Sequence, residues 1–262
     1  MAEVNLIFEA CARNDALKVA GLAFKGSCSL REGRSGMTAL MIAAKNGAAE
    51  ALAIILPLSD PLALSRKGES ALIIAAKAGH GACVRALLPV SDAAACDHRG
   101  TWALLGAVWS RDLDSVMALL PHSDPLKVGV DGDTALSAAI SRGARELVRV
   151  LAPISSHAGE WDGEEMSSVH LAMARNPENL GVMCIQELLP HVDLSMLGPR
   201  GWGGAKMTAL EMARDFCFPE IERLILSRLA ELSAQAEAAT IAFEVQGLGA
   251  FATPMAKPKR SL

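Results

Sequence analysis

The sequence predicts an all-α fold, a solenoid of stacked helix-turn-helix units joined by short hairpin loops. Two motifs repeat in one register, and such self-similarity is typical of stacked supersecondary units. The first motif carries a leucine every 32 residues, at Leu40, Leu72, Leu104 and Leu136. The second carries a proline at the same spacing, at Pro57, Pro89, Pro121 and Pro153. Two independent motifs with one period argue against chance similarity.

The first copy of the motif, GMTALMIAAKNG, shows why each unit should begin with a helix that has defined ends. Thr38 is a good N-cap, because its hydroxyl can accept from an unpaired backbone N–H at the start of the helix. Leu40 lies on the face that turns towards the neighbouring units, and Gly47 can end the helix with a positive φ. A second helix is expected at about 49–56, and Pro57 stops it because a proline further in would lose a hydrogen bond and clash.

Composition agrees with helices that pack through small side chains. Just over half of the 262 residues are apolar, whereas the chain has four Trp, six Phe and no Tyr. A β-sandwich does not fit this composition. The net charge of −4 gives no overall attraction to nucleic acid or to acidic membranes. The six cysteines form no CxxC pair and are expected to be reduced, mostly buried thiols of a cytoplasmic protein.

The later copies carry the resemblance to a known family. The first motif continues as TALMIA, SALIIA, WALLGA, TALSAA, SSVHLA and TALEMA. This series resembles the T-P-L-H-x-A motif of the ankyrin repeat, with alanine or serine at the family's proline and with His170 as the histidine that is kept. The resemblance implies two helices and a hairpin per unit. It also implies non-enzymatic protein binding through the concave surface that hairpin tips and first helices form.

The repeat spacing also predicts the boundaries of the domain, of its units and of the tail. We expect an ankyrin-repeat domain over 1–240 and a flexible tail over 241–262. Within the domain we expect a capping unit at 1–31, repeats at about 32–63, 64–95, 96–127, 128–160 and 161–200, and a C-terminal unit at 201–240. Insertions enlarge the fifth and sixth units at 175–181 and 195–207. The final helix is expected to start near Pro219 and to continue past Leu232, and the tail is either disordered or docked.

The candidate binding residues are those that the register places at hairpin tips or at the exposed ends of first helices. They are Arg34, Met37, Lys45, Arg66, Lys67, Lys77, His98, Arg99, Trp109, Asp131, Asp133, Arg142, Trp161 and Trp202. Basic residues dominate the first half of this surface and acidic residues the second, which suits a protein partner with complementary patches. The alternative is that these charges only keep an alanine-rich solenoid soluble.

Trp109 is the strongest single candidate for a contact with a partner protein. Other copies have Lys45, Lys77 and Ser141 at its position, so an exposed site is expected, and an exposed tryptophan beside Arg99 is typical of an interface anchor. The alternative is that Trp109 packs within the array against Trp102 and His98.

We therefore expect a protein-binding adaptor, effector or steric inhibitor that is cytoplasmic, not membrane-bound and monomeric when alone. We expect neither a catalytic residue, nor a cofactor, nor a bound metal. Two alternatives stay open. One is a nucleic-acid-binding regulator that uses the basic half of the groove and the KPKR tail, although nucleic acid is not the expected partner. The other is an enzyme or metal protein built on the fifth and sixth units.

Overall fold

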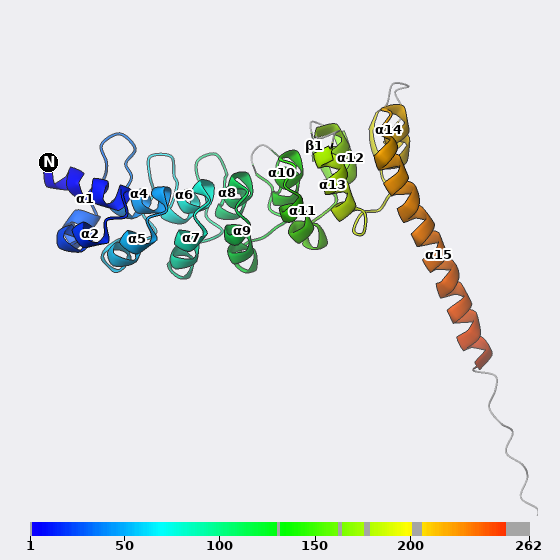
Figure 1. Cartoon of the computed structure of the whole chain (residues 1–262), viewed down its shortest axis with the longest axis horizontal. Helices are drawn as coiled ribbons and strands as arrows, with labels where there is room; N and C mark the ends of the chain where they lie inside the picture. The colour runs from blue at the N-terminus through cyan, green and yellow to red at the C-terminus, as the bar shows by residue number, and fades with distance from the viewer. Residues whose placement is uncertain (1, 130–131, 162–163, 176–178, 201–205, 250–262) are drawn as a thin grey trace, which may run out of the picture.

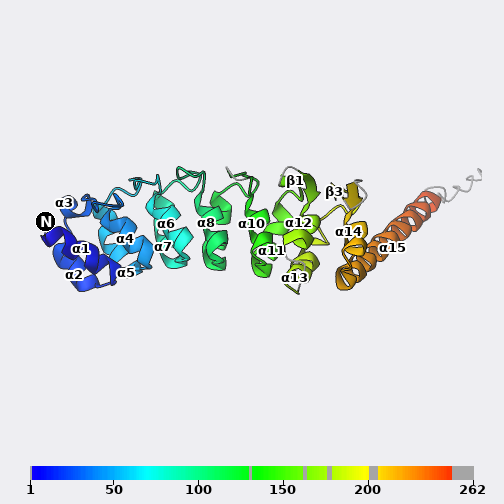
Figure 2. The ribbon, with the colours of Figure 1, turned by 90° about the horizontal axis from the view of Figure 1, so that it is seen from above.

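The computed structural model describes residues 2–129, 132–161, 164–175, 179–200 and 206–249. It shows an elongated stack of helix pairs that follow one another in sequence order (Figure 1), and the view from above shows the same single row (Figure 2). Hairpin loops project along one side of the stack, beyond the first helices of the pairs. The predicted all-α solenoid is therefore confirmed.

The first helices of successive units are α1 (Ala2–Ala12), α4 (Ala39–Asn46), α6 (Ala71–Ala78), α8 (Ala103–Ser110), α10 (Ala135–Ser141), α12 (Ser168–Arg175) and α14 (Ala209–Asp215). The second helices are α2 (Ala16–Leu22), α5 (Ala49–Ile55), α7 (Gly81–Leu87), α9 (Leu113–Leu119), α11 (Arg145–Leu151), α13 (Asn179–Leu188) and α15 (Pro219–Gly249). Each first helix packs on its own second helix and on the first helices of adjacent units, as α6 does with α4, α7 and α8.

The leucine of the repeat forms one buried spine along the stack. Leu40, Leu72 and Leu104 have no exposed surface, and Leu136 is 2% exposed. Val169 continues the line in the fifth unit and is also fully buried. The register read from the sequence therefore places equivalent residues at equivalent depths.

Helix ends follow the local chemistry of the repeat. Thr38 accepts from the Met41 N–H and Ser70 accepts from the Ile73 N–H, as expected of N-caps. Gly47 and Gly79 end α4 and α6 in the left-handed conformation. Arg111 takes that role after α8 with a φ of 59°, which an arginine adopts at a cost.

The four prolines act as predicted, but α5, α7, α9 and α11 are each continued by one tighter helical turn. These turns are η1 (Leu56–Leu58), η2 (Leu88–Val90), η3 (Leu120–His122) and η4 (Ala152–Ile154). Each has its proline at its second residue, and the regular helical hydrogen bonding ends there because proline has no N–H to donate.

Two of the hairpins are regular enough to be sheets. β1 (Ala158–Trp161) pairs antiparallel with β2 (Glu164–Ser167), and β3 (Leu197–Arg200) pairs antiparallel with β4 (Lys206–Thr208). Both belong to the enlarged fifth and sixth units. Among the described residues, earlier hairpins reach only isolated bridges, such as Arg31 with Thr38.

The two ends of the array differ from the sequence prediction. The capping unit, expected as two helices, has a short third helix α3 (Lys25–Cys28) after α2, and Phe24 between them is 62% exposed. At the other end α15 continues to Gly249, beyond the expected start of the tail at 241, and residues 250–262 lie outside the described part of the chain. The continuous helix adds backbone hydrogen bonds through an alanine-rich stretch of high helix propensity.

The cysteines are free thiols, of which Cys96 and Cys217 are exposed. The other four are buried, and burial raises the pKa of the Cys11 thiol to about 12. Within the described residues, no helix combines the length and the apolar character that crossing a membrane requires.

Candidate protein-binding surface

Hydrogen bonds between successive hairpins join separate loops into one ledge. The backbone N–H of Arg66 donates to the carbonyl of Ser35 at 3.1 Å, and the N–H of His98 donates to the carbonyl of Lys67 at 3.0 Å. The Arg66 Nη1 also donates to the carbonyl of Arg34 at 3.2 Å. We call the hairpin tips that these bonds join, residues 34–36, 66–68 and 98–100, the tip ledge.

Beneath the tip ledge lies a hollow of about 420 Å³, which we call the basic hollow. Two hairpins, the end of α4 and one face of α6 form its walls. Its lining residues are Arg34, Ser35, Met37, Lys45, Ser65, Arg66, Lys67, Glu69, Ile74, Lys77 and Ala78. Five of the predicted cations, Arg34, Lys45, Arg66, Lys67 and Lys77, therefore meet in one place.

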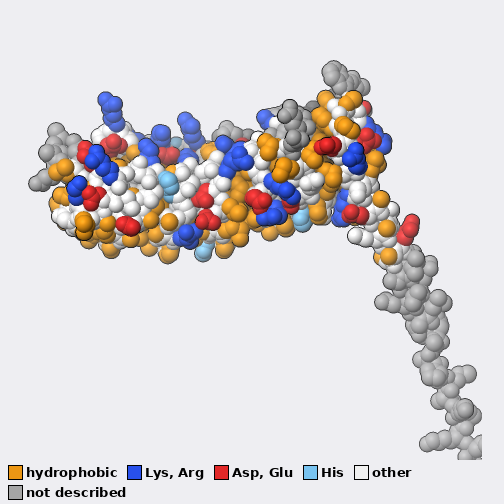
Figure 3. Space-filling view, in the orientation of Figure 1, with side chains coloured by type: hydrophobic (Ala, Val, Ile, Leu, Met, Phe, Trp, Pro, Cys, Tyr) orange, Lys and Arg blue, Asp and Glu red, His pale blue; other side chains and the backbone are white. Residues whose placement is uncertain are grey.

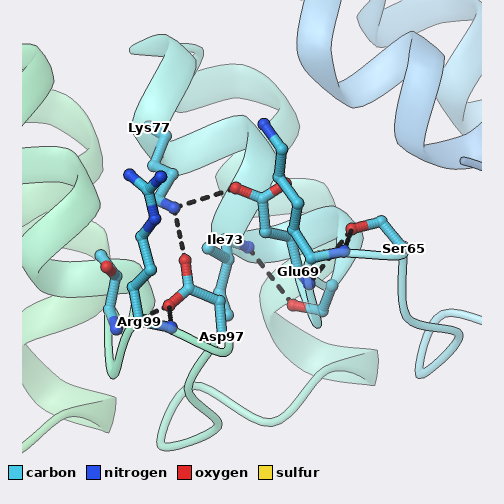
Figure 4. A network of polar contacts seen from close by, with 9 residues as sticks. Ser65, Glu69, Ile73, Lys77, Asp97 and Arg99 are labelled. Carbon is cyan, nitrogen blue, oxygen red and sulfur yellow. Dashed lines mark hydrogen bonds and ion pairs between the residues drawn. The ribbon is translucent and has the colours of Figure 1, made fainter. Parts of the chain in front are cut away.

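Lys77 is the exception among these cations, because two carboxylates hold it (Figure 4). Its Nζ lies 2.9 Å from Glu69 Oε1 and 2.5 Å from Asp97 Oδ2. The other oxygen of Asp97 accepts from the backbone N–H groups of Arg99 at 2.9 Å and Thr101 at 2.8 Å. Asp97 thus ties the end of α6 to the hairpin of the next unit.

This triad corrects the prediction that Lys77 is a free contact residue. Burial alone would lower the pKa of Lys77, but hydrogen bonds and charge interactions with Asp97 and Glu69 outweigh burial and raise the pKa. For Asp97, burial alone would raise the pKa, and the bonds from Lys77, Thr101 and Arg99 lower it on balance. Both residues therefore stay charged, and the charge of Lys77 is used inside the array.

A glycine makes room for the lysine stem. A Cβ on Gly106 of α8 would lie 2.9 Å from Lys77 Cγ and 3.3 Å from Lys77 N. The equivalent positions hold Ile42, Ile74 and Ala138. Comparing the copies in register could have identified Gly106 as the position where another chain segment approaches closely.

The role of Asp97 was not predicted either, although the sequence contains a signal for it. Its equivalent in the preceding unit is Ser65, whose Oγ accepts from the N–H groups of Lys67 and Glu69 at 3.2 Å each. Both residues cap a hairpin turn by accepting backbone N–H groups. Only the aspartate adds a charge, and with it an attachment point for Lys77.

The other predicted cations remain at the surface. Arg34, Lys45, Arg66, Lys67, His98, Arg99 and Arg142 are exposed. Figure 3 shows basic side chains projecting from the hairpin side of the stack. Among the described residues, none of Arg34, Lys45, Arg66 and Lys67 forms an ion pair.

Trp109 is not the fully exposed anchor that the register predicts. It is half-buried and packs against the hydrophobic core near the end of α8. Its large indole covers apolar neighbours at a position where the other copies have lysine or serine. Trp102 is 1% exposed, and Lys127 Nζ lies 5.3 Å from the centre of its ring. Part of the Trp109 indole still faces solvent, so a contact with a partner stays a prediction.

Of the remaining five candidates, the structure describes two in full. Met37 is half-buried and packs against the core, and Asp133 is half-buried and accepts from Ser137 Oγ at 3.2 Å. The backbone of Trp161 ends β1, but its side chain lies outside the description. Asp131 and Trp202 lie outside the described residues altogether.

The predicted change of sign along the groove needs one correction. A second hollow of about 370 Å³ lies beside the basic hollow and shares Met37 and Lys45 with it. Glu9 and Glu32 line this second hollow. The first half of the surface is therefore a basic site bordered by an acidic one. Among the described residues, no group of three or more His, Cys, Asp or Glu side chains is placed to hold a metal ion.

His170 has a structural role. It is fully buried, its Nδ1 lies 2.7 Å from Ser167 Oγ, and its Nε2 lies 3.1 Å from the Met207 carbonyl oxygen. A Cβ on Gly198 would lie 2.3 Å from the ring, so only glycine fits there. The imidazole thus joins the fifth unit to the hairpin of the sixth.

We expect acidification from pH 7.5 to 5.5 to destabilise the protein. Burial lowers the pKa of His170 below its ordinary 6.5, against the opposing effect of its backbone hydrogen bonds, and burial also lowers that of His157. Below pH 6.5 the unfolded chain therefore binds protons that the folded chain does not. Stability should fall by up to about 1.4 kcal/mol per pH unit for each histidine. Urea denaturation at both pH values measures this change, which should be smaller in His170→Gln. Equal unfolding free energies at the two pH values would contradict it.

Comparison with protein families agrees with the geometry. A family model described as ankyrin repeats in three copies matches residues 7–99 and again residues 40–128. These two matches run from the capping unit through the third full repeat. A search of curated proteins finds no match.

Proposed function

Since this chain belongs to the ankyrin-repeat family, whose repeats generally mediate protein–protein interaction, we propose that it binds a partner protein through the tip ledge and the adjoining first helices. The partner docks on a preformed surface. Adaptor, effector and steric inhibitor all use this docking step, and the mechanism is the same for each: a rigid surface holds a partner or covers its working face.

The observation that carries this proposal is the combination of a fixed backbone with exposed cations that form no ion pair within the described part of the chain. Bonds from Arg66 to Ser35 and from His98 to Lys67 order the tips before any partner arrives. A preordered surface loses little conformational freedom on binding, which favours affinity. The exposed charges favour a fast and oriented encounter with a complementary patch.

We further propose that the protein is not an enzyme and acts in the cytoplasm. His170 is fully enclosed, and both of its ring nitrogens have partners within the fold, so it supports structure. The buried thiol of Cys11 has a raised pKa, which disfavours the reactive thiolate.

The proposal predicts that Trp109→Ala combined with Arg99→Ala weakens partner binding by roughly 2 kcal/mol or more, because tryptophan and arginine are the residue types that most often form the energetic centre of an interface. Affinity capture from a cytoplasmic extract, with identification by mass spectrometry, supplies the partner. Isothermal titration calorimetry then measures its affinity for the wild type and the double variant.

The control is Arg85→Ala, which removes an exposed arginine from α7 among the second helices and should leave affinity unchanged. Thermal unfolding of each variant establishes that the fold persists, which matters because Trp109 packs on the core. Unaltered affinity in a folded double variant would remove this part of the surface from the interface.

A further inference from the structure

The basic hollow has an excess of positive charge that the array does not use. Glu69 is the one acidic residue among its described lining residues, and that carboxylate already pairs with Lys77. Arg34, Lys45, Arg66 and Lys67 have no carboxylate partner among the described residues. Four like charges around one hollow repel one another, and an anionic guest would relieve that repulsion. This is a local property, because the whole chain has a net charge of −4.

Apolar atoms also line the hollow between these cations. Ile74 is 6% exposed, and Met37 is half-buried against the core. Both residues line the hollow, as does Ala78 at the end of α6. A hollow of about 420 Å³ with an apolar floor and a charged rim is of the size that holds one or two side chains of a guest.

We propose that the basic hollow binds an acidic segment of the partner protein, with an apolar side chain on Met37 and Ile74 and flanking Asp or Glu carboxylates on Lys45, Arg66 and Lys67. The proposal rests on the proposed function and names the chemistry of its partner. Arg66 is held in place by its bond to the Arg34 carbonyl, so little ordering is needed when a carboxylate arrives.

The second hollow, with Glu9 and Glu32, favours a peptide over a nucleic acid as the occupant of the basic hollow. A nucleic acid backbone carries a negative charge at every step, so a strand that follows the groove would meet Glu9 and Glu32 directly beside the cations. A peptide can change sign within a few residues. The segment should therefore place a neutral or basic residue on the side of Glu9 and Glu32, which fixes its direction along the groove.

Peptide display against the full-length protein tests this. A library of random 12-residue peptides is selected on immobilised wild type, and the affinity of enriched peptides is measured by fluorescence anisotropy. We expect enrichment of Asp and Glu around an apolar residue, with affinity that falls as salt is raised. The double variant Lys45→Glu, Lys67→Glu should bind these peptides at least about tenfold more weakly, since neither side chain has a bond within the described array to lose.

The matched control is Arg85→Glu with Arg149→Glu, which makes the same change in net charge on the second helices α7 and α11. It should keep the wild-type affinity, and thermal unfolding checks that both double variants are folded. Enriched peptides without acidic bias, or peptides that the Lys45/Lys67 variant binds normally, would overturn the acidic-segment proposal while leaving protein binding intact. Failure to enrich any peptide, together with retention of random-sequence DNA or RNA oligonucleotides that the Lys45/Lys67 variant loses, would overturn both proposals.

Discussion

Leu104→Ala is expected to lower the free energy of unfolding by about 2–5 kcal/mol. Leu104 has no exposed surface and lies in α8, which packs between α6 and α10. Truncation removes buried methyl groups and leaves a cavity that helices on both sides hold open. Because each unit is stabilised by its neighbours, the loss should reach beyond the third repeat.

Urea denaturation followed by circular dichroism measures this loss. Leu126→Ala is the matched control, because it removes the same atoms from a side chain that is 50% exposed and should cost well under 1 kcal/mol. Equal losses in the two variants would mean that the spine of leucines does not hold the stack together.

Asp97→Ala is expected to cost about 2–4 kcal/mol, because it removes a nearly buried carboxylate with several partners. The Asp97 side chain is 2% exposed and accepts from Lys77, Arg99 and Thr101. Its loss leaves two backbone N–H groups without their acceptor and Lys77 with Glu69 alone. The effect should be largest between the second and third repeats, where this residue joins two units.

Asp97→Asn separates the two roles of the carboxylate. The amide oxygen can still accept from the N–H groups of Arg99 and Thr101, whereas the charge opposite Lys77 is gone. We expect a loss between those of the wild type and Asp97→Ala in the same denaturation experiment. An alanine variant as stable as the wild type would mean that the triad contributes no more to stability than a surface ion pair does.

The repeat made most of the fold predictable. Thr38, Leu40 and Gly47 satisfy local rules for a cap, a buried face and a helix end, and the later copies repeat those rules at a fixed spacing. The cap was less predictable, since it lacks the proline that ends the second helix in the four following units. The continuation of α15 depends on helix propensity alone, where the register gives no boundary.

The sequence predicted which candidate residues lie at the surface, but not which of them form ion pairs. The register placed Arg66 and Lys67 correctly at an exposed hairpin tip. It could not show that two carboxylates pair with Lys77, because that depends on Asp97 from the next unit and on the space left by Gly106. Trp109 illustrates the same limit: equivalence of position predicted exposure, and the larger side chain packs on the core instead.

Hydrogen–deuterium exchange of the partner-bound or peptide-bound protein tests the docking surface most directly. Backbone amides of the hairpins at 31–38, 65–70 and 97–101 should exchange more slowly in the complex than in the free protein, with the largest change beside Lys45, Arg66 and Lys67. The second helices α5, α7 and α9 should be unaffected. Protection confined to those second helices, with unchanged hairpins, would contradict binding through the tip ledge.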